Sequence, residues 1–132
     1  KNVTKEETAE ITAIFNSFGK SEIVPEHLMD AVTAVSGSSP AYVYMMIEAM
    51  ADAAVVEGMP RPQAYKFAAQ AVLGSAQMVL ETGKHPGELK DMVCSPGGTT
   101  IAAVAKLEET GFRSSIMQSM KACAYKSREM SK

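Results

Sequence analysis

Residues 39–56 read SPAYVYMMIEAMADAAVV, and their composition dictates how the rest of the chain must be arranged. Between Ala41 and Val56 the only charged residues are Glu48 and Asp52, one helical turn apart. Ser39 is expected to cap this helix, and a proline follows it in the first turn. A polar stripe this narrow predicts a helix that is buried on most sides.

The flanking sequence predicts further helices and a single strand. Apolar residues recur with a period of 3.6 over 61–82, and a last helix is expected from Phe112 to about Met130. Shorter helices are predicted over residues 4–18, 25–35, 88–93 and 99–110. Only Lys20 to Val24 reads as a strand, and it has nothing local to pair with. We therefore expect an all-α bundle preceded by a short α-β leader.

The composition bounds the class of protein. The 132 residues fit one compact domain, and with no Trp, 6% aromatic residues and 10 Met the core must be built from small or flexible side chains. The net charge of −2 is interspersed along the chain, which argues against nucleic acid as a partner. Met45, Met46 and Met50 recur at helical spacing, which favours a subunit interface over interior core or a ligand groove.

The cysteines and termini suggest a cellular context. Cys94 and Cys123 have neither a CxxC motif nor a suitable histidine set, so we expect free thiols, no metal site and a reducing, cytoplasmic location. The longest charge-free stretch, Phe67 to Leu80, is interrupted by polar residues, and no membrane span is expected. The chain begins Lys1-Asn2-Val3, without an initiator Met or a signal pattern. We interpret it as a fragment of a longer protein.

A turn before one helix carries the main chemical signal: Ser95-Pro96-Gly97-Gly98-Thr99-Thr100. The proline stops the preceding helix, the two glycines free the backbone, and the two threonines are expected to cap the following helix. Backbone N–H groups at a helix start lack intrahelical partners and lie at the positive end of the dipole, so they can hold a carboxylate or phosphate. The alternative is a tight turn with an ordinary cap.

Several separated motifs carry a family resemblance. They are Leu28-Met29-Asp30-Ala31-Val32-Thr33, Ser36-Gly37-Ser38-Ser39-Pro40-Ala41-Tyr42, Glu57-Gly58-Met59-Pro60-Arg61, His85-Pro86-Gly87 with Leu89-Lys90-Asp91, Ser95 to Thr100, and Gly111-Phe112-Arg113. Together they resemble the C-terminal half of pyrroline-5-carboxylate reductase. The resemblance implies that residues 25–132 form a helical substrate-binding domain and an intertwined homodimer, often assembled into decamers. Residues 1–24 would be the last helix and strand of a Rossmann-type dinucleotide-binding domain.

The resemblance also implies an activity. The family reduces 1-pyrroline-5-carboxylate to L-proline with a hydride from NADPH or NADH, in proline biosynthesis. This chain offers no Gly-x-Gly-x-x-Gly after a strand, so the dinucleotide would be held mainly by a domain outside it. We therefore expect the chain by itself to be inactive.

Site residues follow from the matching positions. The resemblance implies that backbone N–H groups from Ser95 through Thr99, including those of Gly97 and Gly98, bind the substrate carboxylate. Thr100 would be catalytic, with its hydroxyl near the ring nitrogen, where it can donate or accept a proton. Further implied positions are Glu26 near the substrate, the loop Ser36, Gly37 and Ser38 beside the nicotinamide, and Met92 near the cofactor. Some relatives carry a polar residue at this last position, whereas a methionine offers only packing.

Several of these residues have a purely structural reading. Glu26 can be a first-turn acid that complements a helix dipole. Asp30 is expected to cap or pair locally, and His85, in a Pro-Gly turn, to be a structural hydrogen-bonding residue rather than an acid or base. Cys94 borders the turn, but a hydride transfer needs no covalent nucleophile, so we interpret it as a small packing residue.

Two other functions remain open. The chain can be a helical assembly module whose only activity is self-association, because a monomer would expose too much of the apolar helix 41–56. It can also be the helical half of another two-domain reductase that binds a different small imino or keto acid.

Overall fold

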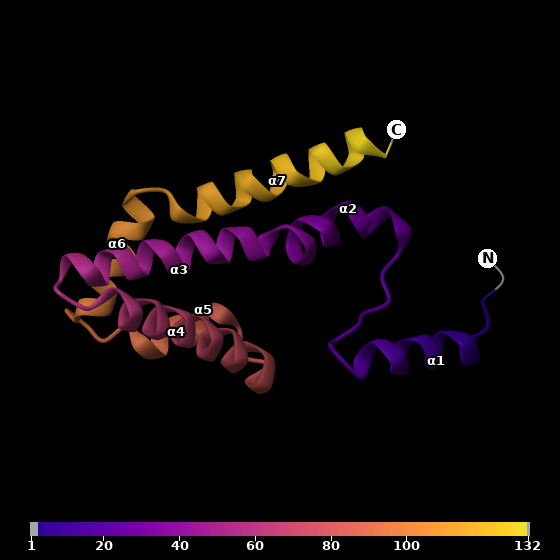
Figure 1. Cartoon of the computed structure of the whole chain (residues 1–132), viewed down its shortest axis with the longest axis horizontal. Helices are drawn as coiled ribbons and strands as arrows, with labels where there is room; N and C mark the ends of the chain where they lie inside the picture. The colour runs from indigo at the N-terminus through magenta and orange to yellow at the C-terminus, as the bar shows by residue number, and fades with distance from the viewer. Residues whose placement is uncertain (1–2, 132) are drawn as a thin grey trace.

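The computed structural model describes residues 3–131, and all regular structure in that range is helical (Figure 1). The predicted helical bundle is confirmed. The α-helices are α1 (Lys5–Asn16), α2 (Met29–Val32), α3 (Ser39–Val56), α4 (Arg61–Thr82), α5 (Pro86–Val93), α6 (Thr99–Glu109) and α7 (Phe112–Met130). A 3-10 turn, Glu26–Leu28, precedes α2, and a π-helix, Thr33–Gly37, joins α2 to α3. The predicted bounds of α4 and α7 are confirmed.

Helices α3 and α4 form a hairpin that is the best-packed part of the chain. The fully buried residues of the pair are alanines, Ala51 on α3 and Ala64 and Ala68 on α4. Side chains this small let two helices approach closely. Arg61, at the start of α4, forms an ion pair with Asp52 on α3. The pair links the two helices close to the turn that joins them.

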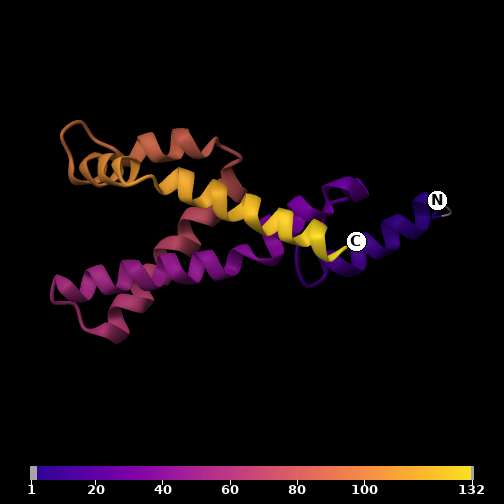
Figure 2. The same cartoon turned by 90° about the horizontal axis from the view of Figure 1, so that it is seen from above.

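Helix α7 packs along α2 and the π-helix, and its other end lies beside α6 (Figures 1 and 2). The π-helix packs against α7 and contributes the remaining fully buried residue, Ala34. The molecule therefore has two ends: α2, the π-helix and the end of α7 at one, and the loop between α5 and α6 at the other (Figure 2).

Helix α1 stands apart from the other helices (Figure 1). A capping box starts it: the Thr4 hydroxyl accepts from the Glu7 N–H at 3.1 Å, and the Thr4 N–H donates to the Glu7 carboxylate at 2.8 Å. The strand predicted over 20–24 is not formed; the segment has no regular structure, because no strand within residues 3–131 is available to pair with it.

The start of α3 also differs from the prediction. Ser39 lies inside the helix, where its hydroxyl bonds the Val35 carbonyl, and Ser38 occupies the cap position without a side-chain capping bond. The reason is that the π-helix leads almost directly into α3. The predicted proline in the first turn of α3 is confirmed.

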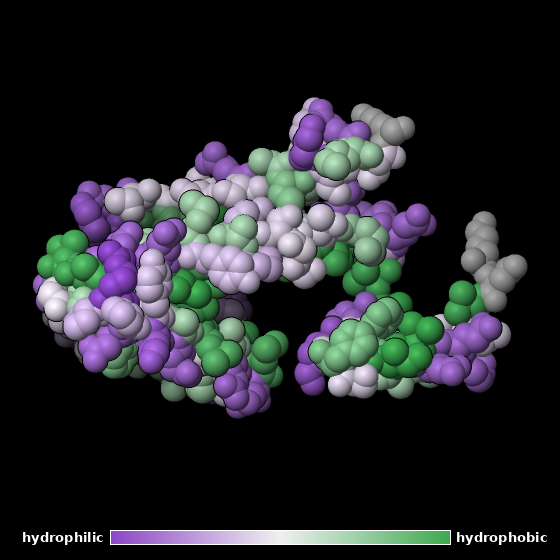
Figure 3. All heavy atoms as spheres, viewed as in Figure 1, coloured by the Kyte–Doolittle hydropathy of each residue, from purple (hydrophilic) through white to green (hydrophobic). Residues whose placement is uncertain are grey.

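The core of a single copy is very small. The four fully buried residues within residues 3–131 are all alanines, whereas large apolar side chains on α3 and α4 are exposed, for example Met45 (69%) and Leu80 (81%). The chain exposes 10656 Å², whereas a compact monomer of this mass exposes about 6,700 Å². Figure 3 shows apolar side chains exposed on the face of α1 and of the main body that is turned toward the viewer. The expected burial of α3 on most sides is therefore not achieved within one copy.

No helix within residues 3–131 combines the length and the apolar character that a membrane crossing requires.

Candidate functional site

The turn between α5 and α6 has a defined backbone geometry. The Gly98 N–H donates to the Ser95 carbonyl oxygen at 3.0 Å, and Gly97 has a φ of +69°. Proline at the second position and a left-handed glycine at the third are the signature of a type II turn. Glycine is therefore favoured at position 97 by its left-handed φ, as the sequence predicts, and proline suits the second position of the turn.

Gly98 is the N-cap residue of α6, and no side chain caps this helix. A Cβ atom at Gly98 would lie 2.3 Å from the Ser95 hydroxyl oxygen, so a larger residue cannot be added without moving that side chain. The predicted capping by the two threonines is wrong, because Thr99 and Thr100 are themselves the first helical residues.

The missing cap leaves the start of α6 able to bind an anion. The first N–H groups of a helix have no intrahelical acceptor and carry the positive end of the dipole. Side chains cap α1 (Thr4) and α5 (His85), whereas α2, α3, α4 and α7 lack a side-chain cap as α6 does. The first turn of α6 contains no acidic residue that would compete for its amides. The hydroxyl-bearing Thr100 is half-buried there, next to the exposed Thr99.

The other predicted site residues lie at α2 and the π-helix. Glu26 is exposed and begins the 3-10 turn, with Pro25 before it in an extended conformation. Ser36 and Gly37 are exposed, and the Ser36 hydroxyl donates to the Val32 carbonyl at 2.9 Å. Ser36 borders a cavity of about 420 Å³ between the extended segment 20–24 and the α2 region.

These two groups of residues are not brought together within one copy. The Ser95–Thr100 turn lies at the α6 end of the molecule, and residues 36–38 lie at the α2 end, with α7 reaching from α6 to α2 and the π-helix (Figures 1 and 2). A 19-residue helix is about 28 Å long. A small substrate therefore cannot touch both groups in a single copy.

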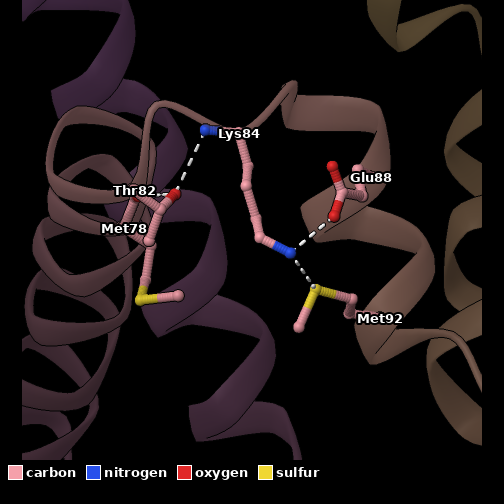
Figure 4. Close-up of polar contacts among 5 residues, drawn as sticks. All are labelled: Met78, Thr82, Lys84, Glu88 and Met92. Carbon is pink, nitrogen blue, oxygen red and sulfur yellow. Dashed lines mark hydrogen bonds and ion pairs between the residues drawn. The ribbon is translucent and has the colours of Figure 1, made fainter.

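Met92 lies on α5, shortly before the turn, and its side chain is exposed. Lys84 points between Glu88 and Met92 (Figure 4): its Nζ atom is 2.5 Å from the Glu88 carboxylate and 4.0 Å from the Met92 sulfur. The Lys84 N–H also donates to the Thr82 hydroxyl at 3.3 Å. Met92 borders an apolar groove of about 490 Å³ between α4 and α5, together with Met78. It thus belongs to the α5 side of the molecule and not to the Ser36–Ser38 segment.

The structural interpretation of His85 is confirmed. Its Nδ1 atom accepts the Gly87 N–H at 3.0 Å and caps α5. Cys94 is a free, half-buried thiol at the end of α5, outside the start of α6. Residues 3–131 contain no group of three His, Cys, Asp or Glu side chains arranged to hold a metal ion.

One interaction was not anticipated from the sequence. Asp30 does not pair locally; it accepts a hydrogen bond of 2.6 Å from Ser127 on α7. One turn earlier on α7, the Cys123 thiol donates to the Ser38 hydroxyl at 3.1 Å. No sequence signal points to these pairs, because their members are 97 and 85 residues apart.

Within residues 3–131 all regular structure is helical, the fully buried residues are alanines, and α6 starts without a side-chain cap behind a glycine turn. This architecture fits the class of helical dimerisation domains. The sequence of the chain matches the pyrroline-5-carboxylate reductase dimerisation family over residues 26–130. The chain therefore belongs to this family.

Relatives support the assignment along the whole chain. The chain is 65% identical over 130 residues to a pyrroline-5-carboxylate reductase from Escherichia coli K12, covering 98% of this chain and 48% of the relative. A Synechocystis relative of the same name is 53% identical over 132 residues, 100% of this chain and 49% of the relative. The chain thus spans about half the length of the relatives it matches.

Solved structures share the fold. A pyrroline-5-carboxylate reductase from Coxiella burnetii superposes with a TM-score of 0.94 at 32% identity, covering 100% of this chain and 49% of that one. A Plasmodium falciparum pyrroline carboxylate reductase, solved with NADP bound, gives a TM-score of 0.90 at 36% identity, covering 100% of this chain and 53% of that one.

Proposed function

We propose that this chain is the substrate-binding and dimer-forming part of a pyrroline-5-carboxylate reductase, which reduces 1-pyrroline-5-carboxylate to L-proline with NADPH or NADH in the cytoplasm. The observation that carries the proposal is the uncapped start of α6 behind the Ser95–Gly98 turn. The names of the relatives support it. Residues 25–132 are the helical domain, and residues 1–24 belong to a neighbouring dinucleotide-binding domain.

The turn and the start of α6 hold the substrate carboxylate. The N–H groups from Ser95 through Thr99 supply the donors, and Gly97 and Gly98 let the backbone come close to the anion. Holding the carboxylate fixes the position of the five-membered ring, so that its imine carbon faces the hydride donor. The contribution of these residues is orientation.

Thr100 acts on the ring nitrogen, one position into the helix from the carboxylate donors. Its hydroxyl can donate a hydrogen bond to that nitrogen and accept one from its proton as the C=N bond becomes single. Half-burial of Thr100 favours this role, because a partly dehydrated hydroxyl competes less with water for the substrate.

The cofactor supplies the hydride when bound, and most of its binding energy comes from the neighbouring domain. On this chain Ser36, Gly37 and Ser38 hold the nicotinamide end, and Met92 packs near the cofactor. Two features favour a flat ring here: Ser36 borders the 420 Å³ cavity, and Gly37 has no side chain that would cover the backbone. Glu26 lies at the same end and is exposed, which leaves its carboxylate accessible to substrate.

A homodimer completes the fold. One copy exposes about 4,000 Å² more than a compact monomer of its mass, whereas each partner of an obligate homodimer buries on the order of 1,000–2,500 Å². A second copy that covers α3 and α4 accounts for much of this excess, and packing of α1 on the neighbouring domain accounts for more. Dimers of this kind are the unit from which decamers are built.

Dimerisation also completes the active site. The carboxylate turn and the Ser36–Ser38 segment lie at opposite ends of one copy (Figure 2). We infer that each active site combines the turn of one copy with the cofactor-facing segment of the other. This arrangement explains why a domain that forms dimers also binds substrate.

The small core also favours self-association as the only activity of the chain. An experiment on the complete protein can distinguish the two functions. A reductase oxidises NADPH in the presence of 1-pyrroline-5-carboxylate, whereas an assembly module does not. The purified 132-residue chain is expected to show no turnover in either case.

Steady-state NADPH oxidation by the complete protein therefore tests the proposal. We expect a rate that saturates with 1-pyrroline-5-carboxylate and is inhibited by proline analogues that retain the carboxylate. If only a different imino or keto acid supports turnover, the chain belongs to a reductase of another specificity. Absence of NAD(P)H oxidation with any such acid would overturn the proposal.

A further inference from the structure

Two long-range side-chain hydrogen bonds connect α7 to the region around the π-helix. Within residues 3–131, every other side-chain hydrogen bond joins residues no more than nine positions apart. The exceptions are Ser127 to Asp30, at 2.6 Å, and Cys123 to Ser38, at 3.1 Å. Cys123 and Ser127 are four residues apart on α7, so both donors lie on one face of the helix.

The two acceptors flank the π-helix Thr33–Gly37. Asp30 precedes it on α2, and Ser38 follows it directly and closes it, with its N–H donating to the Thr33 carbonyl at 2.9 Å. Single π turns are rare and occur frequently at functional sites. Ala34, inside the turn, is fully buried. The π-helix is thus held by packing at its centre and by α7 at both ends.

The surroundings favour both bonds. All four side chains are half-buried, so water competes less with them than at an exposed position. Burial and, after it, the neighbouring Cys123 thiol raise the pKa of Tyr42. The Ser127 bond is the stronger of the two, because its acceptor is a carboxylate and a thiol is a weak donor.

We propose that Ser127 and Cys123 are positioning residues that fix the Ser36-Gly37-Ser38 segment through Asp30 and Ser38. The inference rests on the proposed function, in which this segment holds the nicotinamide end of the cofactor. Neither α7 residue touches substrate or cofactor. Their role is to set the place of the segment relative to the rest of the domain, so that cofactor binding does not have to order it.

Amide hydrogen exchange on the complete protein tests directly whether Ser127 fixes the segment around the π-helix. The measurement does not depend on enzymatic activity. Ser127→Ala removes the donor to Asp30, and Ser119→Ala on the same helix is the matched control, because the Ser119 hydroxyl bonds only the Ser115 carbonyl within α7. We expect faster exchange at amides 34–38 in Ser127→Ala, unchanged exchange on α4, and no effect in the control. Unchanged exchange at amides 34–38 in Ser127→Ala would overturn the proposal.

Cofactor affinity tests the consequence. We expect Ser127→Ala to weaken nicotinamide-cofactor binding, measured by equilibrium titration and as KM, by about tenfold, the lower end for loss of a hydrogen bond to a charged group. The inhibition constant of a proline-analogue carboxylate should stay unchanged. Ser127→Thr, which keeps the hydroxyl, should restore affinity, and Cys123→Val should give a smaller loss than Ser127→Ala.

The two ways of failing are distinguishable. A wild-type protein that does not bind a nicotinamide cofactor would overturn the proposed function and, with it, this inference. Normal wild-type binding together with unchanged affinity in Ser127→Ala would overturn the positioning role alone. Loss of thermal stability without a change in cofactor affinity would give the bonds a structural role only and would equally overturn it.

Discussion

The hydroxyl oxygen of Ser95 lies only 2.3 Å from the position that a Cβ atom on Gly98 would occupy. The same two residues share the hydrogen bond that closes the turn, from the Gly98 N–H to the Ser95 carbonyl. The backbone of α6 therefore begins without a side chain between it and the Ser95 hydroxyl. This close approach leaves the first amides of the helix open to a ligand.

Gly97→Ala should weaken substrate binding in the complete protein. Gly97 has a φ of +69°, a conformation that costs an L-residue about 1–2 kcal/mol. Relaxation of the turn would misdirect the carboxylate donors, so we expect a raised KM for 1-pyrroline-5-carboxylate and an unchanged KM for NADPH.

Gly58→Ala is the control for the backbone strain that alanine causes at a positive φ. Gly58 has a φ of +94° in the turn between α3 and α4, and a Cβ there meets nothing within 4 Å. Both variants should lose similar stability in urea unfolding, and only Gly97→Ala should change the KM for substrate. An equal rise in both variants would show that the turn has no special part in binding.

Thr100→Val should reduce turnover. The substitution keeps the shape and removes the hydroxyl proposed to serve the ring nitrogen, so we expect kcat to fall about 100-fold, the lower range for loss of a general acid–base group. Thr110→Val at the other end of α6, where the hydroxyl bonds the Lys106 carbonyl, should keep normal turnover. Wild-type kcat in Thr100→Val would remove this residue from the mechanism.

The start of α1 should depend on pH through Glu7. The hydrogen bond from the Thr4 backbone N–H, and then that with the Thr4 side chain, lower the pKa of Glu7 from its ordinary value of 4.5. A lowered pKa in the folded state means that the stabilising contribution is present above the unfolded pKa and is lost as pH falls through the folded pKa. The capping box should therefore persist at pH 4.5 and open at lower pH.

NMR can follow this transition at the Thr4 amide. We expect its chemical shift to titrate with a midpoint below 4.5 in the wild type and in Glu10→Gln, because Glu10 lies on the same helix but outside the capping box. Glu7→Gln, which has no carboxylate, should abolish the transition. A midpoint at or above 4.5 would contradict the capping geometry.

Local signals were enough to predict most helices. The bounds of α4 follow from Pro60 and Arg61 at its start and from Gly83, which ends it in a left-handed conformation. The expectation of a cap at Ser39 failed because a π-helix, which has no distinct sequence signature, continues the chain into α3. The strand over 20–24 failed because a strand needs a partner, and none is present in residues 3–131.

The site was predictable where it is local. The glycines of the 95–98 turn indicate its backbone conformation, and His85 in its Pro-Gly turn was correctly read as structural. The pairs Asp30–Ser127 and Ser38–Cys123 could not be found, because each depends on how α7 packs against the α2 region. The apolar residues that recur along α4 include Leu73 and Leu80, and both are exposed within one copy, so their burial depends on a partner that the sequence does not name.

Sedimentation velocity of the 132-residue chain at micromolar concentration tests most directly whether two copies complete this domain. The chain has a mass of 14.1 kDa and exposes 10656 Å², with large apolar side chains along α3 and α4. We expect a species of twice the monomer mass or a multiple of it, because a second copy must cover that surface. A single, stable, monomeric species that retains its helical content would contradict dimerisation and the shared active site with it.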